Sequence, residues 1–233
     1  MSFQGKRIVI TGVSRGIGYE AAKLFLQAGA DVFGTARDPG RLEKAAKELA
    51  ALGPFKSFAA DLSDPAGAKK VAEAVSRHWA ALDMLVNNAG VSSWSKDFKT
   101  EGVDALERDM RVNLFAPHAL IFHLLTLLRN GDEPRVINVS SGAGMRQSMV
   151  ESPIGASYRL SKYALNGLTM LWAGQLKGEV AVNSLDPGWL KTDLGGPDAP
   201  GEAIDGGKRV LALAALSPEV TGKFFHGDKE VEF

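Results

Sequence analysis

Tyr158 and Lys162 stand four positions apart at the start of a long apolar stretch with helical spacing. In a helix, this separation places both side chains on one face. A tyrosine hydroxyl normally keeps its proton until about pH 10, but a cation held nearby favours the phenolate and lowers the pKa. The pair could therefore donate a proton to a carbonyl oxygen near neutral pH. The same spacing also occurs in surface pairs of ordinary amphipathic helices, so the rest of the chain must decide between the two interpretations.

The composition removes several other kinds of chemistry. The chain has no cysteine, which excludes disulfides and thiolate sites, and its four histidines form no metal-like pair, so we expect no catalytic metal. Its 27 basic and 27 acidic residues leave no net charge to attract nucleic acid or anionic lipid. The first predicted strand begins at Arg7, which leaves no room for a signal peptide, and the longest apolar run, 119–128, is broken by His123 and too short to cross a bilayer. We therefore expect a cytoplasmic protein without a nucleic-acid or membrane partner.

Short runs of β-branched residues alternate with longer helical patterns along the whole chain. Such alternation is typical of βαβ units, which build a parallel sheet covered by helices on both faces. We therefore predict an α/β fold, with one dinucleotide-binding domain over residues 1–233 and a Rossmann-type, doubly wound parallel sheet of about seven strands. The expected strands cover 7–10, 31–35, 56–59, 84–86, 135–139, 180–184 and 221–225. The expected helices cover 17–28, 40–51, 65–80, 103–129, 156–176 and 202–216.

A glycine-rich turn, TGVSRGIG, follows the first predicted strand from Thr11 to Gly18. Gly12 permits a tight turn, Gly16 lets the backbone approach a pyrophosphate, and Gly18 allows close packing of the following helix. The N-terminus of that helix offers free N–H groups and the positive end of the helix dipole. Between a first strand and an amphipathic helix, this pattern favours a binding site for dinucleotide phosphates over a purely structural turn.

Arg37 follows the second predicted strand, where an NAD-preferring site usually has an acidic residue against the ribose hydroxyls. A guanidinium suits the 2′-phosphate of NADP, and Arg15 in the glycine-rich turn could approach the same group. The two arginines predict NADP(H) in preference to NAD(H), although Asp38 beside Arg37 keeps NAD(H) open. Both arginines could also be solvated surface residues without a ligand.

Polar residues also follow the third and fourth predicted strands. Asp61, followed by Leu62, could accept a hydrogen bond from an adenine amino group, or it could cap the next helix. The run from Asn87 to Gly90 is small, polar and ends in glycine. Such a run is typical of a strand end that lies against a ligand, and equally of a simple turn.

Asn113 lies in a predicted helix, four residues before Pro117. A proline at that separation cannot donate an N–H to the carbonyl of Asn113 and should disturb the helix there. The freed carbonyl could hold a water molecule. The alternative is a kinked core helix without a catalytic role.

These motifs, in this order, resemble the short-chain dehydrogenase/reductase family: TGVSRGIG, NNAG after the fourth strand, a helical asparagine, a strand ending in Val-Ser-Ser, and YxxxK. The resemblance covers essentially the whole chain and is strongest to carbonyl-reductase and C-signal-like members. It implies a catalytic group of Asn113, Ser141, Tyr158 and Lys162. It implies a cofactor site of Gly12, Ser14, Arg15, Gly16, Ile17, Gly18, Arg37, Asp61, Leu62, Asn87, Ala89, Gly90, Tyr158, Lys162, Pro187, Gly188 and Thr192.

The resemblance further implies an NADP(H)-dependent oxidoreductase that interconverts a carbonyl and an alcohol. Ser141 would hydrogen-bond the developing alkoxide, Tyr158 would donate the proton, and Lys162 would lower the tyrosine pKa and hold the nicotinamide ribose. A water held at Asn113 would link Lys162 to solvent. The rival hypothesis is a non-catalytic NADP(H)-binding sensor or signalling module on the same fold. Such a module could dispense with Tyr158 and Lys162, and this chain keeps both.

The substrate would be a small-molecule carbonyl or alcohol, lined by the segments 92–98, 142–155 and 189–200. These segments supply Trp94, Met145, Met149, Trp189 and Leu194. They suit an apolar or aromatic ketone or aldehyde, and they could equally pack a loop. The short segment 189–202, rich in glycine and proline, could act as a lid. The resemblance also implies a possible homodimer through the helices at 103–129 and 156–176, whereas the C-terminal sequence differs from the endings common in tetrameric relatives.

Overall fold

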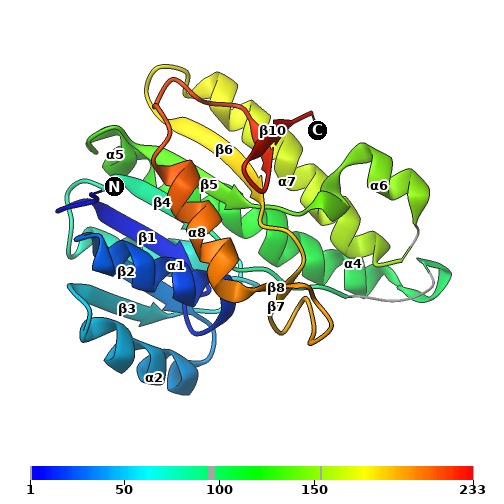
Figure 1. Cartoon of the computed structure of the whole chain (residues 1–233), viewed down its shortest axis with the longest axis horizontal. Coiled ribbons are helices and arrows are strands. Elements are labelled where there is room, and N and C mark those ends of the chain that lie inside the picture. Colours follow the sequence, from blue (N-terminus) through cyan, green and yellow to red (C-terminus); the bar gives the residue numbers. More distant parts are fainter. Residues whose placement is uncertain (1, 94–97, 153, 233) are drawn as a thin grey trace.

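The computed structural model describes residues 2–93, 98–152 and 154–232. Within them, eight strands form one sheet in the order β10-β9-β6-β5-β4-β1-β2-β3, with helices on both faces (Figure 1). Its strands are β1 (Arg7–Thr11), β2 (Asp31–Ala36), β3 (Phe55–Ala59), β4 (Met84–Asn87), β5 (Arg135–Val139), β6 (Ala181–Asp186), β9 (Phe224–His226) and β10 (Lys229–Val231). The α-helices are α1 (Gly16–Gln27), α2 (Pro39–Ala50), α3 (Gly67–Ser76), α4 (Val103–Met110), α5 (Ala116–Arg129), α6 (Arg146–Glu151), α7 (Ala156–Gln175) and α8 (Ala203–Ala214).

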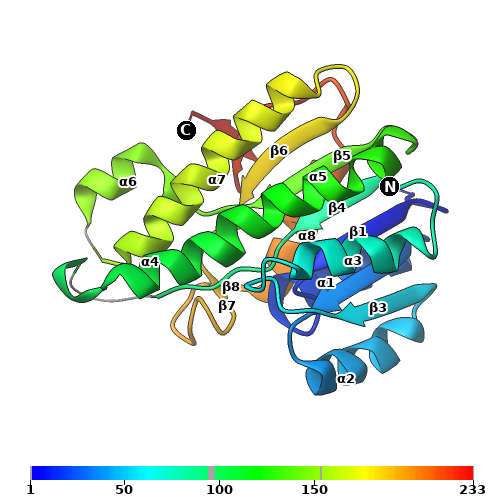
Figure 2. The same cartoon turned by 180° about the vertical axis from the view of Figure 1, so that it is seen from behind.

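Each face of the sheet has its own hydrophobic core, because side chains alternate between the two faces along a strand. In β1, Ile8 and Ile10 belong to the core beneath α1, α2 and α8, whereas Val9 belongs to the core beneath α3, α5 and α7. Figure 2 shows α3, α5 and α7 lying over that second face. The central strands β4 and β5 are therefore buried at every position, as a parallel sheet covered on both sides requires.

The predicted doubly wound α/β fold is confirmed, with one strand more than the seven expected. The additional strand, β10, pairs antiparallel with β9. It has three residues, two of them the charged Lys229 and Glu230, so its sequence carries little strand signal. Two strands of two residues each, β7 (Leu190–Lys191) and β8 (Gly201–Glu202), pair in parallel outside the main sheet. Such short pairs also lie below what periodicity can indicate.

The predicted helix over 103–129 consists of α4, a π-helical segment (Arg111–Phe115) and α5. The helical stretch Val103–Arg129 is long and apolar enough to cross a membrane, with a mean hydropathy of 1.3 in its most apolar window. Length and composition are weak evidence, because a core helix meets the same test. Here Leu120, Ile121, Leu124 and Leu128 are buried in the core on the sheet, so this helix is a core element.

Candidate active site

Four of the segments singled out above follow strands that are neighbours in the sheet. The glycine-rich turn follows β1, the NNAG run follows β4, the Ser140-Ser141 pair follows β5, and Pro187 follows β6. These four strands are adjacent and parallel. Their carboxyl ends therefore meet at one edge of the sheet, where open α/β folds bind their ligands.

The glycine-rich turn between β1 and α1 is held tightly against the loop after β4. Gly12 has φ +77° and Gly16 has φ +62°, values that favour glycine. A Cβ on Gly18 would lie 2.4 Å from Nδ2 of Asn88, which leaves no space for a larger residue. Oγ1 of Thr11 accepts hydrogen bonds from the backbone N–H groups of Asn88 and Ala89, both at 2.9 Å. The two loops thus form one continuous backbone surface.

This surface fits a dinucleotide phosphate group. Helix α1 begins after Arg15, whose side chain does not cap it, and its first turn contains no acidic residue. The first N–H groups of α1 are therefore available to an anion, in the positive field of the helix dipole. Thr192 approaches from the loop after β7, with Cγ2 3.4 Å from the position of a Cβ on Gly16.

The structure assigns local roles to both acidic residues that the sequence left ambiguous. Asp38 is the N-cap of α2, and its Oδ1 accepts the backbone N–H of Arg41 at 2.9 Å. This hydrogen bond explains an acidic residue beside the exposed Arg37 without any ribose contact. Asp61 accepts the N–H and the hydroxyl of Ser63, at 2.8 and 2.7 Å, and does not cap α3, which begins six residues later.

A chain of buried amides runs inward from the NNAG loop. Nδ2 of Asn87 donates to Oδ1 of Asn138 at 2.8 Å, and Nδ2 of Asn138 donates to Oγ1 of Thr169 at 2.9 Å. Oδ1 of Asn87 is buried and has no hydrogen-bond partner among the residues that the structure describes. A buried amide oxygen without a partner is costly, so this atom suits a ligand that donates a hydrogen bond. Gly90 lies nearby, and a Cβ there would be 3.6 Å from Nζ of Lys162.

Asn113 is fully buried in the π-helical segment and ties two segments of the site together. Its Oδ1 accepts the N–H of Val91 at 2.9 Å, and its Nδ2 donates to the carbonyl of Val91 at 2.8 Å and to Oγ of Ser161 at 2.9 Å. Ser161 in turn donates to the carbonyl of Tyr158 at 2.7 Å. The disturbance expected from Pro117 is present, because the helix widens to π geometry here.

Helix α7 carries Tyr158 and receives its N-terminal cap from a distant residue. Gly155 precedes the helix with φ +66° and has no side chain to cap it. Instead, the buried Glu101 accepts the backbone N–H groups of Ala156 at 3.1 Å and Ser157 at 2.7 Å. No local sequence pattern indicates this contact, because a cap normally lies within the few residues before its helix. The segment before α4 thus fixes the start of α7.

Tyr158, Ser141 and Lys162 come together at the carboxyl edge of the sheet. Tyr158 is 6% exposed and hydrogen-bonds Ser141, whose Oγ also accepts the N–H of Ala143 at 3.1 Å. Nζ of Lys162 lies 5.7 Å from the centre of the Tyr158 ring and donates to the carbonyl of Val139 at 2.8 Å. Two side chains that can donate hydrogen bonds and one buried ammonium therefore converge on a single small region.

Burial has the largest effect on the pKa values of Tyr158 and Lys162. It raises the pKa of Tyr158 to about 12, although the hydrogen bond with Ser141 acts in the opposite direction. It also lowers the pKa of Lys162 to about 8. The YxxxK spacing predicts a lowered tyrosine pKa, whereas desolvation of the phenolate outweighs the favourable interactions in this structure and the pKa of Tyr158 is raised.

The structure describes most of the segments predicted to line the substrate site. Trp94 lies outside the described residues. Met145 and Met149 are half-buried at α6, whereas Trp189 and Leu194 are exposed by 60% and 47%. Nε1 of Trp189 donates to the carbonyl of Gly195 at 2.7 Å and so closes the loop between β7 and β8. Arg15 reaches this loop through an ion pair with Asp193 at 2.7 Å, which links it to the glycine-rich turn.

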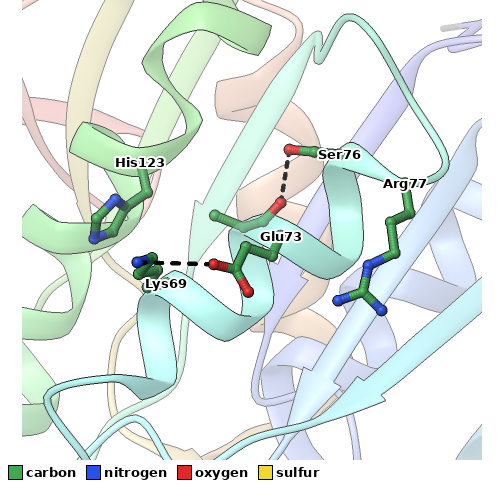
Figure 3. Close-up of a pocket in the computed structure, with 6 residues that line it drawn as sticks. Lys69, Glu73, Ser76, Arg77 and His123 are labelled. Atoms are coloured by element: carbon green, nitrogen blue, oxygen red, sulfur yellow. Dashed lines mark hydrogen bonds and ion pairs between the residues drawn. The ribbon is translucent and has the colours of Figure 1, made fainter.

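A separate hollow of about 460 Å³ lies between α3 and α5 and shares no residue with this site (Figure 3). In it, Lys69 pairs with Glu73 at 3.9 Å, and His123 approaches from the neighbouring helix. Both charged side chains are more than half exposed. The hollow is a solvated groove between two helices, and neither Tyr158 nor Lys162 lines it.

A glycine-rich strand–turn–helix beside a buried group of tyrosine, serine and lysine defines a nucleotide-binding α/β protein equipped for proton transfer. The sequence matches the family model described as short chain dehydrogenase over residues 6–203. The chain therefore belongs to the short-chain dehydrogenase/reductase family.

Individual relatives agree with this assignment. The chain is 40% identical over 192 residues to the rhamnolipids biosynthesis 3-oxoacyl-(acyl-carrier-protein) reductase of Pseudomonas aeruginosa, covering 80% of this chain and 73% of that protein. Its structure matches the Pseudomonas aeruginosa RhlG/NADP active-site complex with a TM-score of 0.89 at 31% identity, covering 97% of this chain and 95% of that one. It matches the NADPH-bound carbonyl reductase from chicken fatty liver with a TM-score of 0.88 at 27% identity, covering 98% and 94%.

Replacing Lys162 by methionine should stabilise the cofactor-free protein at neutral pH by roughly 2–3 kcal/mol, because it removes a buried charge at the loss of one hydrogen bond. Below pH 8, Lys162 is charged in both the folded and the unfolded chain, so folded wild type carries the full free-energy cost of the buried charge. Between pH 8 and the ordinary lysine pKa of 10.5, the unfolded chain binds more protons, so wild type gains stability as the pH rises. The advantage of the variant should therefore shrink over this range.

Urea unfolding at about pH 7 and about pH 10 measures this difference. Lys177→Met is the matched control, because Lys177 is exposed just beyond α7 and its removal relieves no burial. An equal gain for both variants, or a gain for Lys162→Met that does not change with pH, would contradict the cost assigned to Lys162.

Proposed function

We propose that this short-chain dehydrogenase/reductase transfers hydride between NADP(H) and a small carbonyl or alcohol substrate, with Tyr158 as the general acid and base. The protein is an oxidoreductase by family. The observation that carries the proposal is the buried Tyr158 hydroxyl, which hydrogen-bonds Ser141 and has the Lys162 ammonium 5.7 Å from its ring. That group lies at the same edge of the sheet as the glycine-rich turn.

The cofactor-binding surface is proposed from the loops at this edge. Gly12, Gly16 and the first turn of α1 would receive the pyrophosphate, and the unpaired oxygen of Asn87 would accept a hydrogen bond from the nucleoside portion. When bound, the nicotinamide supplies or accepts the hydride. The remaining proposed contacts are Ser14, Arg15, Ile17, Gly18, Arg37, Asp61, Leu62, Ala89, Gly90, Lys162, Pro187, Gly188 and Thr192.

The side chains of the chain itself perform the proton transfer in this proposal. Ser141 donates to the substrate oxygen as negative charge develops on it, which stabilises the transition state. Tyr158 donates its proton to that oxygen, and its pKa of about 12 keeps the proton in place until then. Lys162 returns the proton to Tyr158 from the side of the buried Asn113. Asn113 fixes the geometry by holding Val91 and Ser161.

Two observations support NADP(H) over NAD(H). Asp38 is committed to capping α2, which leaves the exposed guanidinium of Arg37 as the group at the end of β2 that can meet a 2′-phosphate. Relatives of this chain have been solved with NADP or NADPH bound. Arg15 would assist, and its present partner Asp193 would exchange for the phosphate.

The substrate is proposed to be a ketone or aldehyde with an apolar substituent. Relatives are named for 3-oxoacyl and carbonyl reduction, and apolar side chains such as Met145 and Met149 stand beside the Ser141 turn. A panel of a 3-oxoacyl thioester, a diketone, a quinone and an aromatic aldehyde, each tested with NADPH, covers this range. We further propose that the protein works in the cytoplasm.

We also propose a homodimer formed through α4, α5 and α7. The helical stretch Val103–Arg129 and α7 expose large apolar side chains, among them Phe115 (57%), Phe122 (62%) and Leu171 (74%). Apolar surface gathered on neighbouring helices is typical of a protein interface. The helices lie side by side in both views of the chain (Figures 1 and 2).

Tyr158→Phe should lower kcat for reduction of the best panel substrate by roughly 100-fold to 10,000-fold, because the proton donor is lost. NADPH should still bind, as measured by thermal stabilisation. Tyr163→Phe is the control, since Tyr163 lies on the same helix and is 40% exposed. Undiminished turnover by Tyr158→Phe would refute the proposed mechanism, and NADPH binding without turnover of any substrate by wild type would favour the sensor.

Arg37→Leu should raise KM for NADPH by about 10-fold to 100-fold and leave KM for NADH nearly unchanged, because a charge-assisted contact to the 2′-phosphate is lost. Initial rates with each cofactor at saturating substrate measure the effect. Lys44→Leu removes an exposed charge from α2 and should change neither value. A wild-type protein that prefers NADH would contradict the role of Arg37.

Leu171→Glu should convert the dimer into monomers, because it places a charge in the proposed apolar interface. Light scattering after size-exclusion chromatography measures the mass. Leu52→Glu introduces the same charge at a 38% exposed leucine beyond α2 and should leave the mass unchanged. A wild-type protein that is monomeric at high concentration would refute this interface.

A further inference from the structure

Asp186 ends β6 and is only 4% exposed although it can carry a charge. Its register partner on the adjacent strand β9 is His226. Oδ2 of Asp186 lies 2.5 Å from Nδ1 of His226, and its Oδ1 accepts the backbone N–H of Gly188 at 2.9 Å. A buried carboxylate needs such partners, because an unpaired charge in the interior is costly. His226 and the N–H of Gly188 thus compensate the charge of Asp186 at the end of β6, where a proposed cofactor-facing loop begins.

The pair contacts the backbone of two loops of the site. A Cβ on Gly142, the residue after Ser141, would lie 2.8 Å from Oδ2 of Asp186 and 3.8 Å from Nδ1 of His226. On the other side, Asp186 holds Gly188, which has φ +81°. The carboxylate therefore lies between the Ser141–Gly142 turn and the Pro187–Gly188 turn.

Two further contacts fix the same strand end. The backbone N–H of Gly227 donates to the carbonyl of Asp186 at 3.0 Å, so the β9–β10 hairpin is anchored here. Nη1 of Arg209, from α8, donates to the carbonyl of Pro187. A Cβ on Gly188 would lie 2.7 Å from that nitrogen, which shows how closely the guanidinium covers the turn. The turn is therefore held by a strand, a hairpin and a helix.

The Asp186 charge also acts on the proton-transfer group. It raises the pKa of Tyr158 and of Lys162, in each case together with Asp109 of α4 and after the larger effect of burial. A negative charge disfavours the phenolate and favours the ammonium. The titratable and charged groups on the elements around Asp186 are His226 of β9, Arg209 of α8, Tyr158 and Lys162 of α7, and Asp109 of α4.

We propose that Asp186 and His226 form a positioning pair, which holds the Pro187–Gly188 turn against the Ser141–Gly142 turn and so shapes the cofactor-facing backbone beside Ser141. The effect of this pair on catalysis rests on the proposed function, in which Tyr158 transfers the proton. Its effect on the shape of the cofactor-facing turn does not depend on turnover. His226 acts through Asp186, and neither residue is assigned a contact with the substrate.

His226→Ala should raise the Kd of NADPH by about 10-fold to 100-fold, because the turn that Asp186 holds becomes loose. His226→Asn should restore most of the affinity, since the amide nitrogen of asparagine can donate from the position of Nδ1. Nicotinamide fluorescence measures both values without any substrate. Glu230→Gln is the control, because it breaks the exposed Lys223–Glu230 pair on the same hairpin and leaves Asp186 untouched.

Asp186→Asn should shift the pH dependence of the reaction. In alcohol oxidation, Tyr158 must lose its proton, so kcat/KM rises as the pH passes through its pKa. Removing the negative charge should lower that pKa, so the rising limb should move to lower pH. The asparagine oxygen can still accept the N–H of Gly188, so a purely structural role would leave the limb in place.

The outcomes separate this inference from the proposed function. If wild type turns over no substrate, the proposed function fails, whereas a loss of NADPH affinity in His226→Ala that His226→Asn restores would still establish the positioning role. If wild type is active but His226→Ala binds NADPH normally and Asp186→Asn leaves the limb unshifted, the inference is overturned and the proposed function stands. Circular dichroism of each variant confirms that it is folded.

Discussion

The burial of one ammonium group beside a phenol is the constraint on which this site depends. A lysine that is 4% exposed must find an acceptor, and Nζ of Lys162 finds the carbonyl of Val139. That carbonyl belongs to the last residue of β5, where the ladder of the sheet ends and backbone groups become free. The carboxyl edge of a parallel sheet therefore supplies the partner that makes the buried lysine tolerable, and it places that lysine beside the loops of β1, β4 and β6.

Rigid placement of Tyr158 requires that α7 be fixed at more than one point. The buried Glu101 caps its first turn, and Ser161 connects it through Asn113 to Val91 in the loop after β4. Asn113 can make these contacts from a segment in which Pro117 has removed one helical hydrogen bond and the helix has widened. The irregular helical hydrogen bonding thus lets the Asn113 side chain point inward. Its hydrogen bond to Ser161 connects the π-helical segment to α7, which is distant in sequence.

The fold and the proposed site residues were predictable to the extent that local pattern determines them. Short β-branched runs that alternate with helical patterns predicted the sheet, and Pro117 predicted the disturbed helix. Contacts that join distant segments were not predictable: Glu101 caps a helix more than fifty residues away, and His226 meets Asp186 only because β9 pairs with β6. The short strand β10 was missed because three residues with two charges carry no periodic signal. The direction of the pKa shift of Tyr158 was not predictable either, since burial cannot be read from a spacing of four.

Burial also decides the protonation state of Tyr158. With a pKa of about 12 set mainly by burial, Tyr158 keeps its proton at neutral pH. The carboxylates of Asp186 and Asp109 act in the same direction, and only the hydrogen bond with Ser141 opposes them. Tyr158 is therefore in the protonation state that carbonyl reduction requires, but donating the proton leaves a phenolate in a desolvated, negatively charged environment. Groups that stabilise the phenolate are needed for the transfer, and the hydrogen bond with Ser141 acts in this direction.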